Sequence, residues 1–238
     1  MHDIALRTRH LLAETARLAV AYGRQPGEVT LVGVSKTHPA ESIRTAVDAG
    51  LRHVGESYVQ EALPKITALS DLPVAWHFVG RLQANKTAAV AASFDWVHAV
   101  DRVRIAERLD AQRPADKPPL QCCIEVNLSG EPSKGGVTPE DLPALADAVA
   151  ALPRLRLRGL MVLPAPVDDP VAQREPFARL RALRDALRRQ HPQLDTLSMG
   201  MSGDMEAAIA EGATLVCIGT ALFGPRPARV AVSGSDDA

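Results

Sequence analysis

Short apolar runs alternate with amphipathic segments along most of this chain. Most of the runs are rich in Val, Leu and Ile and have the length of strands that are buried on both faces. They span residues 29–35, 52–55, 74–79, 96–100, 120–128, 155–162, 196–198 and 214–218. A stretch with helical spacing follows each of the first seven runs, a turn over residues 220–223 follows the last, and an additional amphipathic helix over residues 3–23 precedes the first. The pattern predicts an α/β fold whose strands pair in parallel.

Eight β and α units in about 200 residues are the count of a (β/α)8 TIM barrel. An open, doubly wound sheet would show the same alternation, but the number of units favours the closed barrel. We expect a single domain over residues 1–228 that includes the extra N-terminal helix. The polar residues 229–238 are predicted to form a disordered tail.

Composition excludes several classes of function. The 238 residues are 46% hydrophobic and 3% aromatic, and the net charge is −1, so neither nucleic acid nor an anionic membrane is an expected partner. No stretch approaches the roughly 18 apolar residues of a membrane span, and the N-terminus lacks a signal core. Cys122, Cys123 and Cys217 lie inside apolar runs, which predicts buried, reduced thiols in a cytoplasmic protein and no metal site.

The first predicted strand, VTLVGVSK, ends in Lys36. Pro39 follows at the expected start of a helix, so the amine lies at the carboxyl end of a buried parallel strand. Enzymes and cofactor binders of the α/β class keep reactive groups at that end. The alternative is a lysine that marks the strand end and extends into water.

Two further turns at the same end of the barrel have the features of a phosphate site. SMGMSGDMEAAIAEG places Gly200 and Ser202 before a helix, where we expect Ser202 to be the N-cap, and Gly219 and Thr220 follow the last strand. Barrels often bind phosphate in the loops after strands seven and eight. An amine opposite a phosphate site suits a ligand with an aldehyde and a phosphate, and pyridoxal 5′-phosphate has both.

Other polar residues are less informative. Asn127 at a strand end is a candidate for supporting the ligand site, and His77 is either a ligand contact or a histidine satisfied within the core. Lys134, in the SGEPSKGG loop, is expected to be solvated, with a transient contact to incoming cofactor as the alternative.

Five segments resemble one known family. GVSKTHPAESI, GESYVQEALPK, WHFVGRLQANK, LSMGMSGDMEAAIAEG and IGTALFG are similar, in this order, to the pyridoxal phosphate homeostasis proteins (the YggS/PROSC family). The resemblance implies a barrel like the N-terminal domain of alanine racemase, with the cofactor held as an aldimine on Lys36 and its phosphate near Ser202, Gly219 and Thr220. It also implies a role in keeping and delivering the cofactor, with apo-forms of its enzymes as partners and no established catalysis.

Three positions depart from the family pattern. Ser57 replaces an asparagine, Gly203 replaces an acid, and Cys217 replaces an arginine that in the related racemases faces the pyridine nitrogen. A thiol is at best a weak hydrogen-bond donor. We therefore expect no strong contact to the ring nitrogen from this position.

A cofactor-dependent amino-acid racemase or lyase is the alternative function, and an aldolase that needs no cofactor is a third. Racemisation by two bases needs an acid/base group on each face of the substrate. In the racemases that the chain resembles, the second comes from an added β domain and a partner subunit. Only residues 221–238 follow the last predicted strand and its turn, so we expect no such domain, and we expect a monomer.

Overall fold

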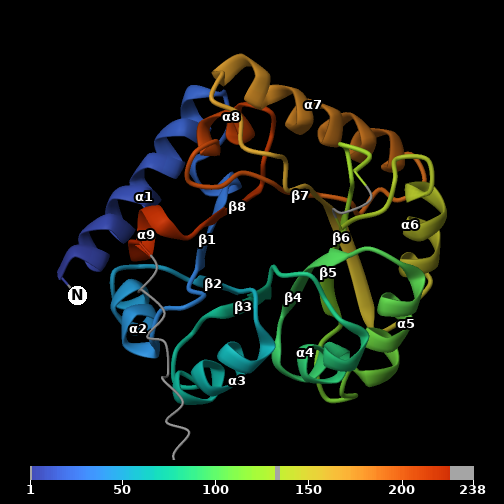
Figure 1. Ribbon diagram of the computed structural model, residues 1–238, viewed down its shortest axis with the longest axis horizontal. Coiled ribbons are helices and arrows are strands. Elements are labelled where there is room, and N and C mark those ends of the chain that lie inside the picture. The colour runs from blue at the N-terminus through green and yellow to red at the C-terminus, as the bar shows by residue number, and fades with distance from the viewer. Residues whose placement is uncertain (1, 132–134, 226–238) are drawn as a thin grey trace, which may run out of the picture.

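The computed structural model describes residues 2–131 and 135–225, which form a closed barrel of eight parallel strands paired in chain order (Figure 1). The strands are β1 (Thr30–Val34), β2 (His53–Glu56), β3 (Ala75–Phe78), β4 (Trp96–Val100), β5 (Leu120–Glu125), β6 (Leu155–Met161), β7 (Thr196–Ser198) and β8 (Leu215–Ile218). The helices are α1 (His2–Ala21), α2 (Ala40–Asp48), α3 (Val59–Ala68), α4 (Thr87–Ser93), α5 (Val103–Gln112), α6 (Leu142–Ala150), α7 (Pro170–Leu187), α8 (Met205–Ala210) and α9 (Thr220–Phe223). Short 3₁₀ turns precede β1 (Pro26–Glu28) and α4 (Ala84–Lys86). The closed barrel predicted from the sequence is confirmed, and the open sheet is excluded.

The main hydrophobic core lies between the strands and the surrounding helices. It joins outward-facing strand residues such as Leu31 and Val54 to helix residues such as Ile43 and Leu109. A separate small cluster of Ala99, Cys123 and Met161 packs with Trp96 inside the barrel. Side chains of a strand alternate between the two sides, so every second strand residue is available to the barrel interior.

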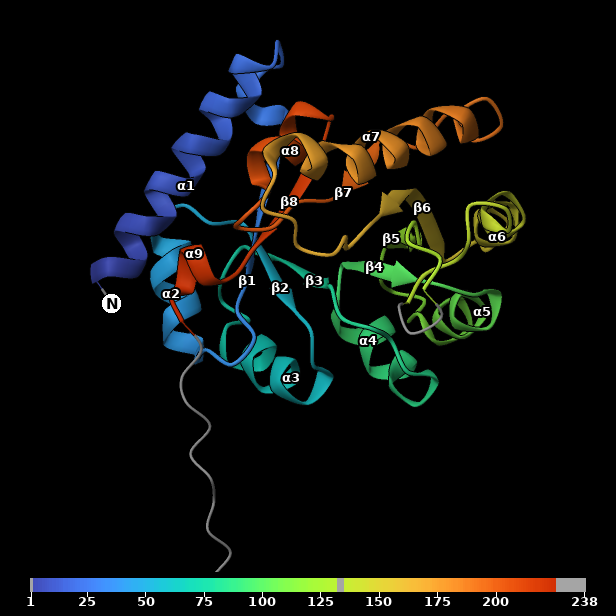
Figure 2. The same ribbon diagram turned by 45° about the horizontal axis from the view of Figure 1, so that its top comes forward.

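Helix α1 lies on the outside of the ring, along α2, α8 and α9 (Figures 1 and 2). Its residues Ile4, Leu11 and Leu18 are spaced by about two helical turns and are all buried. The predicted extra N-terminal helix is therefore present, and it covers the part of the barrel where the first and last units meet. None of the helices in residues 2–131 and 135–225 is long and apolar enough to cross a membrane.

Two structural expectations fall on parts of the chain outside the described residues, namely the solvated Lys134 and the disordered tail over residues 229–238. All three cysteines are free, and Cys122 and Cys123 are buried as expected, whereas Cys217, which was also expected to be buried, is only half-buried.

Candidate functional site

A pocket of about 330 Å³ opens at the carboxyl ends of the strands. Its wall is formed by strand ends and by the loops that follow them. The lining residues are Val34, Lys36, Ser57, Val79, His98, Met161, Val162, Leu163, Ser198, Met199, Gly200, Met201, Ser202, Gly203, Cys217, Gly219 and Thr220. The structure thus brings together five of the seven residues predicted to bind the cofactor, namely Lys36, Gly200, Ser202, Gly219 and Thr220.

Lys36 lies in a tight turn directly after β1. The amide of His38 donates to the carbonyl of Ser35 at 3.0 Å, which closes the turn. Thr37 has φ = 69°, a conformation that is unfavourable for a β-branched residue. Its amide donates to a carboxylate oxygen of Glu61 at 2.9 Å. This bond from α3 helps to hold the turn that places Lys36 at the pocket wall.

A buried ion pair supports the same turn from the outer side of β2. Glu56, which is fully buried, accepts hydrogen bonds from Lys65 Nζ at 2.7 Å and from the Ser35 hydroxyl at 2.6 Å. Lys65 also donates to the Ser35 carbonyl at 2.9 Å. Burial raises the pKa of Glu56, and the bonds from Lys65 and Ser35 oppose that rise. The residue before Lys36 is therefore fixed at both its side chain and its carbonyl.

The loops after β7 and β8 form the wall next to Lys36, because β8 pairs with β1. Gly200 has φ = +99°, and a Cβ there would lie 2.6 Å from the Cβ of Ala208, so this turn requires glycine. The Ser202 hydroxyl accepts a hydrogen bond at 3.4 Å from the amide of Ala221, which connects the two loops. A Cβ on Gly203 would meet no atom within 4 Å. This wall of the pocket therefore consists of hydroxyl groups and backbone, with open space beside Gly203.

The predicted capping role of Ser202 is wrong. Helix α8 begins at Met205, and its N-cap residue is Asp204. Asp204 accepts a hydrogen bond from the Met201 amide, which closes a turn over residues 201–204. The helix therefore begins only after this turn. Ser202 is consequently a loop residue at the pocket wall.

The floor of the pocket is polar but uncharged. His98 Nδ1 lies 2.7 Å from the Ser198 hydroxyl, and Ser198 and Cys217 both line the pocket beside it. Burial lowers the pKa of His98 to about 3 and raises the pKa of the Cys217 thiol to about 12. Both groups are therefore neutral near pH 7. Among the described lining residues there is no Asp, Glu or Arg, and Lys36 is the one cationic side chain.

His98 is the end of a row of three imidazoles inside the barrel. His53 Nδ1 lies 2.9 Å from His77 Nε2, and His77 Nδ1 lies 2.9 Å from His98 Nε2. His77 is thus one layer behind the pocket wall and contacts the pocket through His98. No role for His53 or His98 was predicted from the sequence, although β2, β3 and β4 each carry a histidine that faces the interior.

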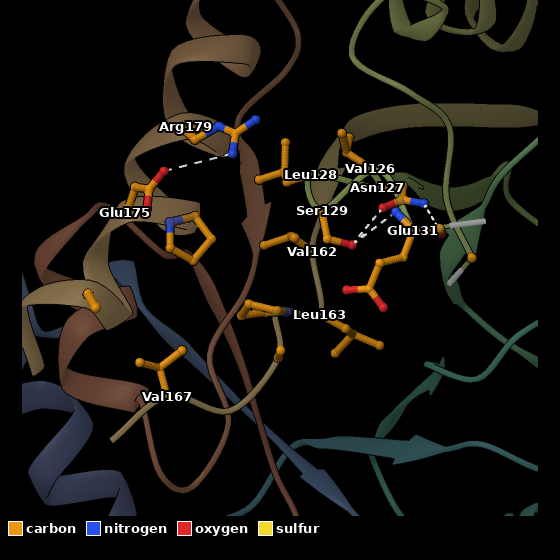
Figure 3. A pocket seen from close by; sticks show the side chains of 15 residues that line it. Val126, Asn127, Leu128, Ser129, Glu131, Val162, Leu163, Val167, Glu175 and Arg179 are labelled. Carbon is orange, nitrogen blue, oxygen red and sulfur yellow. Dashed lines mark hydrogen bonds and ion pairs between the residues drawn. The ribbon is translucent and has the colours of Figure 1, made fainter. Parts of the chain in front are cut away.

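Asn127 lies in a neighbouring pocket of about 270 Å³, between the β5 and β6 loops and α7 (Figure 3). Its side chain binds its own loop: the amide donates to the Glu131 carbonyl at 2.9 Å, and its oxygen accepts from Ser129 Oγ at 3.1 Å. On the far side of this pocket Glu175 pairs with Arg179 (Figure 3). Asn127 therefore shapes a loop beside the Lys36 pocket without lining it.

Comparison with known proteins identifies the family. Residues 10–227 match the family model described as alanine racemase, N-terminal domain. A pyridoxal phosphate homeostasis protein of Pseudomonas aeruginosa is 57% identical over 226 residues, which cover 95% of this chain and 97% of that protein. This chain belongs to the pyridoxal phosphate homeostasis protein family.

Other members of the pyridoxal phosphate homeostasis family agree in extent and in structure. The Escherichia coli K12 protein is 51% identical over 229 residues, covering 95% of this chain and 98% of its own length. PipY of Synechococcus elongatus PCC7942, solved with pyridoxal phosphate bound, superposes with a TM-score of 0.79 at 40% identity and covers 93% of this chain and 100% of PipY. The family resemblance noted in the sequence is therefore confirmed.

Proposed function

We propose that this protein binds pyridoxal 5′-phosphate and takes part in its homeostasis and delivery, without catalytic turnover of its own. The observation that carries the proposal is the shared pocket of Lys36 with Ser202, Gly219 and Thr220. The names of the relatives and the cofactor bound to PipY support it.

The residues present fit this cofactor. A volume of about 330 Å³ falls in the usual range for small-ligand pockets. Bound there, pyridoxal phosphate supplies an aldehyde that an amine can hold covalently and a phosphate that hydroxyls and backbone amides can bind. Lys36 is the amine of the pocket, and Gly203 leaves open space beside the hydroxyl of Ser202. Val34, Val79 and Met161 offer apolar contacts for a ring.

We assign these residues the following roles. Lys36 holds the aldehyde carbon, Ser202 and Thr220 donate to the phosphate, and Gly200 and Gly219 let the backbone approach it closely. Asn127 and His77 contribute only through their neighbours, because neither lines the pocket.

The neutral floor of the pocket supports a binding role over a catalytic one. Enzymes of this cofactor commonly hold a strong charged partner against the pyridine nitrogen to strengthen the electron sink. The Cys217 thiol and the His98 imidazole cannot act as such a partner near pH 7, since burial keeps both neutral. A cofactor that is held covalently but weakly activated suits storage and transfer. The recipients would be apo-enzymes in the cytoplasm, and we propose that the protein acts as a monomer.

The test is the absorption spectrum of the purified protein before and after borohydride treatment, with mapping of the modified peptide. Wild type should carry a cofactor band that borohydride fixes to Lys36. Lys36→Ala should lose the fixed label, whereas the exposed Lys117→Ala should keep it. Equal fixation in Lys36→Ala would overturn the assignment.

The racemase or lyase alternative is tested separately, by exchange of deuterium at the α-carbon of a panel of amino acids. We expect no exchange at ordinary enzymatic rates, about 1 s⁻¹ or faster. Exchange at such a rate in wild type, lost in Lys36→Ala, would establish an enzyme.

A further inference from the structure

The row of imidazoles leads from one end of the barrel to the floor of the pocket. His53 is the first residue of β2, half-buried at the amino end of the strand, whereas Ser198 is the last residue of β7. Ser57 lies four residues beyond His53 and lines the pocket. Four extended residues span about 13 Å, so His53 lies about that far below the pocket along the strand direction. The interior side chains between them, His77 and His98, are both fully buried.

The atoms that pair along this row follow a strict order. Each ring offers Nδ1 to the next group toward the pocket, and the two buried rings receive that contact on Nε2. A neutral imidazole has one N–H and one lone pair on its two nitrogens. Consequently both nitrogens of His77 and of His98 are used within the row, and all the rings must point their N–H groups in the same direction.

Only two arrangements satisfy every contact. In the first, each Nδ1 carries the proton, His98 donates to Ser198, and the Ser198 hydroxyl donates onward at the pocket floor. In the second, each Nε2 carries the proton and Ser198 donates to His98, so that its oxygen faces the pocket as an acceptor. The state of His53 thus determines whether the pocket floor donates or accepts a hydrogen bond.

We propose that His53, His77, His98 and Ser198 form a proton relay that sets, and can reverse, the hydrogen-bond polarity of the cofactor pocket. The inference rests on the proposed function and adds to it a route for one proton to a ligand atom beside Ser198 and Cys217, such as the nitrogen of a heteroaromatic ring. His53 and His77 are positioning residues in this scheme.

One passage moves one proton and no electrons. A solvent hydronium ion gives a proton to Nε2 of His53 and becomes water, and the Nδ1 proton of His53 passes to Nε2 of His77. The Nδ1 proton of His77 passes to Nε2 of His98, and that of His98 passes to Ser198 Oγ. The original hydroxyl proton of Ser198 leaves for the acceptor in the pocket. All rings end neutral in the second arrangement, and the reverse passage restores the first.

The surroundings favour neutral rings at every position. Burial lowers the pKa of His53 and His77, and the neighbouring imidazoles lower that of His77 further. Among the described residues near the other end of the row, Asp95 acts on His53, and Arg158 lies 5.2 Å from the centre of Trp96, whose ring stacks on His77. At the pocket end the charged group is Lys36. A row that stays neutral passes protons by exchanging tautomers instead of storing charge.

The arrangement can be tested on the protein without added cofactor. Ring nitrogen NMR of protein labelled at histidine should show His77 and His98 as neutral rings with the same tautomer at pH 7. His10→Gln, on the exposed face of α1, removes one control signal and should leave both rings unchanged. Opposite tautomers in the two rings, or an imidazolium in either, would overturn the relay whether or not the protein binds pyridoxal phosphate.

Proton passage is tested on protein loaded with pyridoxal phosphate by following the cofactor absorption after a pH jump. His53→Phe should still load the cofactor but slow the relaxation, by roughly 100-fold if the row is the main path. His53→Gln, which can both donate and accept, should restore part of the rate, and His10→Gln should match wild type. Unchanged relaxation in a loaded His53→Phe protein would disprove the relay. Failure of wild type to load would instead refute the proposed function and leave the tautomer result standing.

Discussion

Lys36 owes its position to neighbours that never enter the pocket. The turn that carries it is held by Glu61 at the Thr37 amide and by Lys65 at the Ser35 carbonyl. Lys65 reaches this carbonyl because Glu56 fixes its ammonium group. The position of the Lys36 amine therefore depends on a buried carboxylate, a second lysine and a strained threonine.

Replacing Lys65 with methionine should destabilise the protein. Glu56 would stay buried without its cation, at a cost of about 3–5 kcal/mol. The folded carboxyl would then hold its proton to higher pH than the unfolded one, whose pKa is near 4.5. Because the folded state binds the extra proton, stability should fall as pH rises above that value. Urea unfolding at pH 5 and pH 8 measures the deficit, which should be larger at pH 8.

Two variants control this measurement. Lys117→Met removes an exposed lysine and should cost less than about 0.5 kcal/mol. Adding Glu56→Gln to Lys65→Met should recover part of the loss and remove its dependence on pH. A deficit that is equal at pH 5 and pH 8 would contradict the account of Glu56.

At the scale of elements, the strands and their order were predictable, whereas the contacts between them were not. Runs such as TLVGV and LQCCIE are short and mostly apolar, as strands buried on both faces are, so the sequence identifies them as strands of a parallel sheet. The positions of Lys36 and Gly219, at the carboxyl ends of the first and last strands, follow from this assignment. The pairing of Glu56 with Lys65 depends on how α3 packs against β2, and the row from His53 to Ser198 depends on which strands meet inside the barrel. Spacing along one strand reveals neither contact. The start of α8 was misplaced because a local side-chain bond from Asp204 outcompeted the expected cap.

The junction of β6 and β7 illustrates such a contact. Gly159 pairs with Thr196, and the register between β5 and β6 shifts just before it, so that Arg158 is the extra residue. A Cβ on Gly159 would lie 1.8 Å from the Thr196 carbonyl oxygen. No side chain can be accommodated without moving one of the two strands.

Gly159→Ala should therefore lose about 3 kcal/mol or more, because the clash is with backbone. Thermal unfolding followed by circular dichroism measures it. Gly27→Ala is the matched control, since a Cβ there meets no atom within 4 Å and φ is not positive. It should be neutral within about 0.5 kcal/mol. Similar melting temperatures for the two variants would show that the strands separate more easily than the structure implies.

At the scale of the whole molecule, the barrel separates two environments. Outside the ring, aliphatic side chains fill the space between strands and helices. Inside it, imidazoles, hydroxyls and thiols extend from His53 to the pocket. The interior groups stay neutral because they are buried, and this neutrality links the stability of the whole fold to pH.

The fold should lose stability in mild acid through its buried histidines. An unfolded histidine binds a proton near pH 6.5, whereas the pKa of folded His98 is about 3. Between these values the unfolded state binds the extra proton, so the His98 contribution is complete above pH 6.5 and declines as pH falls. At pH 5 the loss from this one residue should be about 2 kcal/mol relative to pH 8.

His98→Gln should be less stable than wild type at pH 8, because the amide cannot reproduce both ring contacts. Its further loss of stability between pH 8 and pH 5 should be smaller than that of wild type by about 2 kcal/mol. Urea unfolding at both pH values gives the comparison, with His10→Gln as the exposed control that should follow wild type. If His98→Gln and wild type lost the same free energy between pH 8 and pH 5, burial would not lower the pKa of His98, and His98 would be protonated in the folded protein at pH 5.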